Sequence, residues 1–127
     1  MTQQEAVQHW REGSRGSLIM AKAGLHEKEY LLALFHCHLA VEKALKAEWI
    51  AEHDAPDVPH THDLNYLADQ LHGRFTEEQK KLFSDLNDFA VTARYSDPPW
   101  AQTQATPERT ALWIEKTGSF LTSFLPS

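Results

Sequence analysis

The sequence predicts an all-α protein, an up-and-down bundle of four to five helices that forms one domain over residues 1–127. The 127 residues include only 5 glycines and 6 prolines, which leaves few turn signals for a many-stranded fold. Apolar residues recur at helical spacing in several segments, whereas no alternating strand pattern and no internal repeat is found. A chain of this length usually folds around a single core.

The first predicted helix begins at Thr2, because Thr2 and Glu5 have the spacing of a capping box. Small and apolar residues then recur at helical spacing as far as Leu25, and Gly24 is the plausible end of the helix. Residues 13–17 have the sequence Gly-Ser-Arg-Gly-Ser, in which each Gly costs about 1 kcal/mol relative to Ala in a helix. We interpret this stretch as a tight crossing with a second helix, and a local break is the alternative.

The second predicted helix runs from about Glu27 to Glu52, a segment without Gly or Pro and rich in Leu, Ala, Glu and Lys. The segment 54–59 holds two prolines and ends it. Thr61 or Asp63 can then cap a short third helix. The apolar residues of this short helix are Leu64, Leu67 and Leu71.

The fourth predicted helix begins with a second capping box, Thr76 and Gln79, followed by one buried stripe. That stripe consists of Leu82, Phe83, Leu86, Phe89, Ala90 and Ala93. Residues 94–105 contain Asp-Pro-Pro-Trp and are predicted to be non-helical, with Trp100 either anchoring this loop or contacting a partner. Thr106, Pro107 and Glu108 start the last helix. Its apolar residues are Leu112, Trp113, Phe120, Leu121 and Phe124.

Charge and cysteine content limit the partners and the compartment. Twelve Lys and Arg against eighteen Asp and Glu leave a net charge of −6, so contact with RNA is not favoured except locally. The single Cys37 has no internal disulfide partner and is expected to pack in the core. The N-terminus lacks the layout of a secretory signal, and the longest apolar run is far shorter than the roughly 20 residues of a membrane span. We expect a soluble cytoplasmic protein with no membrane contact.

Two polar residues fall inside the apolar stripe of the second helix. His38 and Glu42 are four residues apart and therefore lie on the same face as the core positions around them. A buried carboxylate without a donor costs several kcal/mol, so Glu42 needs His38, Lys46 or a group from another helix. One interpretation is a polar layer that fixes the packing. The other is a site for a ligand or an interface.

Four motifs together resemble the HEPN domain. Residues 38–47, His-Leu-Ala-Val-Glu-Lys-Ala-Leu-Lys-Ala, resemble the second-helix signature of the family, with its Ala-x-Glu-Lys-x-Leu-Lys-Ala core. Trp10 lies upstream, residues 60–64 resemble the Thr-His-Asp-Leu element, and Ala93-Arg94-Tyr95 follows in the order of the family. The resemblance spans nearly the whole chain.

This resemblance implies a helical bundle, often a homodimer, encoded beside a minimal nucleotidyltransferase. Such domains are proposed to bind nucleotides or to act in toxin-antitoxin pairs. Arg94 would hold a phosphate while Tyr95 stacks on or hydrogen-bonds a base, or Arg94 would instead tether its loop to Glu42 or to a helix end. The candidate ligand-binding residues are His38, Glu42, Lys43, Lys46, His62, Arg94 and Tyr95.

Some HEPN proteins are metal-independent ribonucleases that use an Arg followed, after four to six residues, by a His. Here Arg94 is followed by Tyr-Ser-Asp-Pro-Pro-Trp-Ala, and no other Arg has a His at that distance. No catalytic residue is therefore predicted, and a binding module is the leading hypothesis. The alternatives are a ribonuclease toxin in which His62 or His38 replaces the missing His, and a purely structural dimerisation domain.

No metal or other cofactor is predicted, although the chain has 8 histidines. His36 and His38 are two residues apart on a helix and point about 200 degrees away from each other, so they cannot share an ion. His60 and His62 lack a third ligand in local register.

Overall fold

The structure, a computed structural model, describes residues 1–55, 57–95 and 99–126, with the backbone alone for residues 92–95 and 99. The helices of these residues are α1 Gln3–His26, α2 Tyr30–His53, α3 Leu64–Asp69, α4 Glu77–Tyr95, α5 Pro99–Thr103 and α6 Pro107–Phe124. No strand occurs in the described ranges. The predicted all-α bundle is confirmed, and α5 is added to it.

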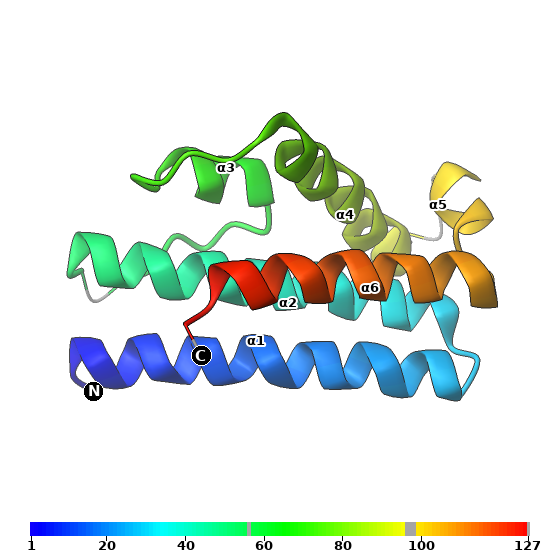
Figure 1. Cartoon of the computed structure of the whole chain (residues 1–127), viewed down its shortest axis with the longest axis horizontal. Coiled ribbons are helices and arrows are strands. Elements are labelled where there is room, and N and C mark those ends of the chain that lie inside the picture. The colour runs from blue at the N-terminus through cyan, green and yellow to red at the C-terminus, as the bar shows by residue number, and fades with distance from the viewer. Residues whose placement is uncertain (56, 96–98, 127) are drawn as a thin grey trace.

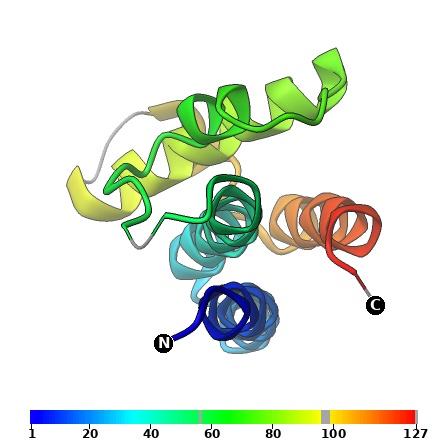
Figure 2. The same cartoon turned by 90° about the vertical axis from the view of Figure 1, so that its left-hand side faces the viewer.

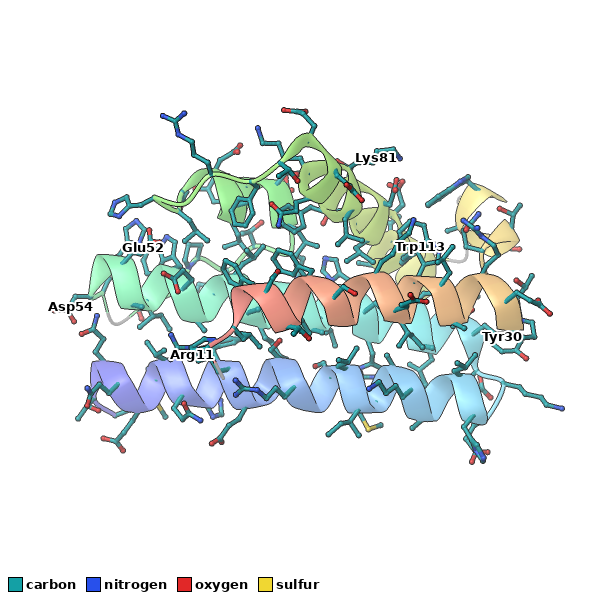
Figure 3. All side chains as sticks on the ribbon, in the orientation of Figure 1. Arg11, Tyr30, Glu52, Asp54, Lys81 and Trp113 are labelled. Atoms are coloured by element: carbon teal, nitrogen blue, oxygen red, sulfur yellow. The ribbon has the colours of Figure 1, made fainter. Side chains whose placement is uncertain are left out.

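Helix α2 is the centre of the bundle. Viewed end-on in Figure 2, α1 lies below it, α6 lies beside it, and α3 and α4 form a layer above it. Helices α1 and α2 run antiparallel along their whole length, and α4 crosses them obliquely (Figure 1). Figure 3 labels Tyr30 and Asp54, which mark the two ends of α2. Residues of α2 are therefore placed to meet side chains from every other layer.

The predicted capping residues start four of the helices. Both capping-box hydrogen bonds form at Thr2, and both form again between Thr76 and Gln79. The Asp63 carboxylate caps α3 by accepting from the backbone N–H groups of residues 65 and 66. The Thr106 hydroxyl accepts from the backbone N–H of residue 109 at 3.2 Å. These starts follow from local chemistry alone, because each cap satisfies N–H groups that have no partner within the helix.

The crossing of α1 and α2 is tight at residues 13–17, as predicted, and α1 is continuous there. The hydroxyl of Ser14 donates to the backbone oxygen of Ala40 at 2.6 Å. A Cβ built on Gly13 would lie 3.2 Å from Cδ of Lys43. Small side chains are needed at residues 13 and 14, where α1 approaches α2 closely, whereas Gly16 has no heavy atom within 4 Å of an added Cβ.

The prediction that Gly24 ends α1 is wrong. The helix continues to His26 and closes through Lys28, which has a φ of 62°. Gly24 is buried inside the helix, where an added Cβ would lie 3.1 Å from Cβ and 3.2 Å from Cα of Ala33. The glycine serves close packing between α1 and α2, and that packing overrides its usual tendency to end a helix.

The segment 94–105 is more helical than predicted. Helix α4 continues through Tyr95, and Pro99 opens the short helix α5, because a proline suits the first helical position. Residues 96–98 lie outside the described ranges. Trp100 stacks on Phe89, with ring centres 5.4 Å apart, and meets the edge of Trp113 at 6.3 Å. The anchoring interpretation of Trp100 agrees with these contacts.

The core gathers around α2. Its fully buried aliphatic and aromatic side chains include Leu34, Val41, Leu45, Leu64, Leu67, Phe83, Leu86 and Phe89. Cys37 is fully buried among them, and burial raises the pKa of its thiol to about 12. This agrees with the predicted packing role of Cys37. In the described ranges, no helix has the length and apolar character needed to cross a membrane.

Gly24→Ala should destabilise the protein, whereas Gly16→Ala should stabilise it. Alanine gains up to about 1 kcal/mol over glycine in a helix, and Gly16 has no heavy atom within 4 Å of its added Cβ. At Gly24 the new methyl meets the backbone of Ala33, and overpacking of this kind costs about 1–3 kcal/mol. Urea unfolding of both variants measures the difference. Equal stability of the two would show that the helices do not pack closely at Gly24.

Candidate functional site

His38 and Glu42 face inward from α2. Their exposed fractions are 1% and 4%, although both are polar. The spacing of four residues on a helix places them on one face, and that face lies against the layer of α3 and α4. The sequence prediction that both residues point toward the core is therefore confirmed.

Both oxygens of the Glu42 carboxylate have a donor. Nζ of Lys46, one turn further along α2, lies 3.1 Å from Oε2. Nδ1 of His62 lies 2.9 Å from Oε1. Lys46 is also buried, at 5% exposed, and its ammonium lies 5.6 Å from the ring centre of Trp10 on α1. The buried carboxylate is thus balanced by a cation on its own helix and by an imidazole from elsewhere in the chain.

His62 reaches Glu42 from the connection that precedes α3. Its side chain is 51% exposed, whereas that of Glu42 is 6% exposed. The backbone oxygen of His62 accepts from Nε2 of His38 at 2.8 Å, so the connection is joined to α2 by two hydrogen bonds. Asn87 of α4 holds the following turn, accepting from the backbone N–H of Leu64 and donating to the Asp63 carboxylate. His62 therefore connects the buried carboxylate with the surface.

The hydrogen bond of His38 fixes the tautomer of its neutral ring. A carbonyl oxygen only accepts, so Nε2 carries the proton and Nδ1 of the neutral ring is an acceptor. Burial lowers the pKa of His38, outweighing the raising effects of the His62 carbonyl, the Glu42 carboxylate and the nearby Asn87 amide. Nδ1 lies 3.8 Å from Oε1 of Glu42, and no described residue hydrogen-bonds to it.

The structure brings together His38, Glu42, Lys46 and His62, which we call the Glu42 cluster. Lys43 does not join it, since its ammonium donates to the hydroxyl of Ser17 on α1 at 2.9 Å. Consecutive helical residues point about 100 degrees apart, so Lys43 lies on a different face of α2 from Glu42, the face next to α1. The side chains of Arg94 and Tyr95 lie outside the described residues, and their roles stay predictions.

Sequence reasoning missed two contacts around the Glu42 cluster, one made by Trp10 and one made by Asn87. It placed Lys46 as a partner of Glu42 but not over the ring of Trp10. It also missed Asn87, because a single Asn on a helix carries no signal that it will hold a distant turn. Within the described ranges no group of three His, Cys, Asp or Glu side chains is arranged to hold a metal ion.

Comparison with known proteins identifies the family. The model of the HEPN domain matches residues 7–124. The chain belongs to the HEPN family. Its fold also recurs in the crystal structure of TT1696 from Thermus thermophilus, with a TM-score of 0.78 and 22% identity over 91% of this chain and 93% of that chain. No curated protein matches the sequence.

The HEPN match covers the Glu42 cluster completely. The signature on α2 supplies His38, Glu42 and Lys46, and the Thr-His-Asp-Leu element supplies His62. Two motifs that are separate in the sequence thus meet at one carboxylate. Their meeting gives a physical reason for both motifs to occur in one chain.

Lys46→Met should destabilise this HEPN domain by about 3 kcal/mol, because it leaves the Glu42 carboxylate buried without its cation. The double variant Glu42→Gln with Lys46→Met should recover most of that loss, since it buries no unpaired charge. Thermal and urea unfolding of the two proteins test this. A double variant no more stable than Lys46→Met would contradict the assignment of the loss to an unpaired charge.

Proposed function

We propose that this HEPN domain is a binding module that engages a nucleotide or a minimal nucleotidyltransferase partner at the Glu42 cluster. The observation that carries the proposal is a buried ion pair, Glu42 and Lys46, joined to the surface by a histidine that is about half exposed. A buried ion pair is costly to maintain, because both charges must be removed from water. A purely structural layer needs no imidazole at the surface.

Family membership supports the wider proposal. We propose a homodimer in the cytoplasm that acts with a nucleotidyltransferase as a toxin-antitoxin pair, as the resemblance to the family implies. Arg94 would bind a phosphate as a charged hydrogen-bond donor, and Tyr95 would contact the base. The net charge of −6 favours such a local contact over binding along an RNA backbone.

Calorimetry of the full chain with ATP, CTP, GTP and UTP tests the proposal, together with the product of any adjoining nucleotidyltransferase gene. We expect a binder among them to raise the melting temperature, because a ligand of the folded state alone stabilises that state. If none of them binds, the proposal is wrong. A purely structural dimerisation domain would then remain, with a melting temperature that nucleotides do not change.

Arg94→Ala should weaken binding of the nucleotide about tenfold or more, since a lost charged hydrogen bond is worth roughly 1.5–3 kcal/mol. Arg74→Ala is the matched control, because Arg74 is an exposed arginine in the connection between α3 and α4. Calorimetry of both variants measures the two affinities. Equal losses would show that the effect of Arg94 is one of net charge only.

A second function, a ribonuclease with a non-standard site, is favoured by one observation. Glu42 holds the exposed His62 by a hydrogen bond to Nδ1, an arrangement in which a carboxylate orients a proton-transfer histidine. His38 is unsuited to that role, because it is 1% exposed and already bonded through Nε2. Cleavage of bulk RNA that is lost in His62→Ala but kept in His60→Ala would support this function. A pure protein that leaves RNA intact at high concentration would exclude it.

A further inference from the structure

Two hydrogen-bond acceptors face each other inside the Glu42 cluster. Nδ1 of His38 and Oε1 of Glu42 are 3.8 Å apart, and both residues are buried. Among the described residues His62 donates to Oε1, but none donates to Nδ1. A buried acceptor without a donor destabilises the folded protein. The cluster therefore favours an incoming group that brings more than one N–H.

Among the side chains that the structure describes, none forms a hydrogen bond with Nδ1 of His38. Nε2 of His38 already carries the proton that is donated to the His62 carbonyl, so Nδ1 is left as a lone pair. The Asn87 side chain binds the turn before α3, since its oxygen accepts from the backbone N–H of Leu64 and one of its N–H groups donates to the Asp63 carboxylate. Lys46 donates to the other oxygen of Glu42, at 3.1 Å.

The imidazole of His62 is the most exposed part of the cluster. It is 51% exposed, and it donates to the same oxygen that faces His38. Rotation about its side-chain bonds opens Oε1 to a ligand, while the backbone oxygen of His62 keeps its bond to His38. A ligand N–H that replaces the imidazole leaves the carboxylate with the same number of donors.

The charge of the cluster favours a neutral donor. Glu42 and Lys46 form a buried ion pair with a net charge of zero, so a guanidinium or ammonium would add an uncompensated charge. An aromatic amino group is neutral and has two N–H bonds. Its nitrogen can lie about 2.9 Å from both acceptors, which is the usual length of an N–H hydrogen bond.

We infer that the cluster binds the exocyclic amino group of a nucleobase, as in adenine or cytosine, between Nδ1 of His38 and Oε1 of Glu42. This inference rests on the proposed nucleotide-binding function and specifies the base. Uracil has a carbonyl oxygen at the position of the cytosine amino group. This oxygen is itself an acceptor, so it would be repelled by Nδ1 of His38 and Oε1 of Glu42. A site built to hydrogen-bond an N–H rejects an analogue that lacks it.

Calorimetry of the full chain with two matched ligand pairs tests the inference. CTP should bind about tenfold tighter than UTP or better, and ATP should exceed the triphosphate of purine riboside, which lacks the amino group, by a similar factor. Equal affinities within each pair would overturn the inference and leave the proposed function in place. If no nucleotide binds, the inference falls together with the nucleotide-binding part of that function, and binding of a protein partner is unaffected.

A histidine pair on α2 provides the variant and its control. His38→Phe removes one of the two acceptors and should lower the ratio of CTP to UTP affinity severalfold, while Glu42 keeps the remainder. His36→Phe, at a half-buried position that points away from His38, should leave the ratio unchanged. A ratio that persists in full in His38→Phe would overturn the inference.

Nitrogen NMR of the wild-type protein gives a test that does not depend on the stability of a variant. The resonance of the unprotonated His38 nitrogen should shift on addition of CTP and stay in place with UTP. If CTP binds but the resonance shifts with neither nucleotide, the base lies elsewhere and the inference is overturned.

Discussion

The burial of one carboxylate on the central helix is the constraint on which the site depends. Glu42 is 4% exposed, and an isolated buried carboxylate would cost several kcal/mol. Lys46 compensates it locally, because a residue one turn further along the helix reaches the same carboxylate. His62 compensates it across the fold, and this requires the connection after α2 to return over the middle of that helix. The path of residues 57–63 is therefore set partly by electrostatics.

The HEPN signature on α2 combines packing residues with site residues. Leu45 fills the core, and the backbone oxygen of Ala40 accepts from Ser14 of the crossing helix. Glu42 and Lys46 form the charged pair, while Lys43, between them in sequence, donates to Ser17 of α1. A match to this signature thus establishes how α2 packs, whereas the chemistry depends on which side chains the other layers bring to Glu42.

Sequence alone predicted the features that depend on neighbours in the chain. The caps at Thr2 and Thr76 and the inward direction of Glu42 follow from spacings of three or four residues. Gly24 was misjudged because its role depends on Ala33, which follows the turn into α2. Helix α5 was missed because prolines indicate a break as readily as a helix start. His62 was a candidate, but its pairing with Glu42 depends on tertiary structure.

Access to the two histidines separates binding from catalysis in this cluster. A proton-transfer residue must reach its substrate, and His38 is closed to solvent and hydrogen-bonded through the nitrogen that carries its proton. His62 is accessible, but the carboxylate that orients it also neutralises Lys46 through its second oxygen. The charge of Glu42 is therefore shared, and its main effect on His62 is to hold the ring in position. Each buried charge in this cluster is compensated, and one buried acceptor has no donor among the residues that the structure describes. Such a cluster suits recognition of a donor group better than transfer of a proton.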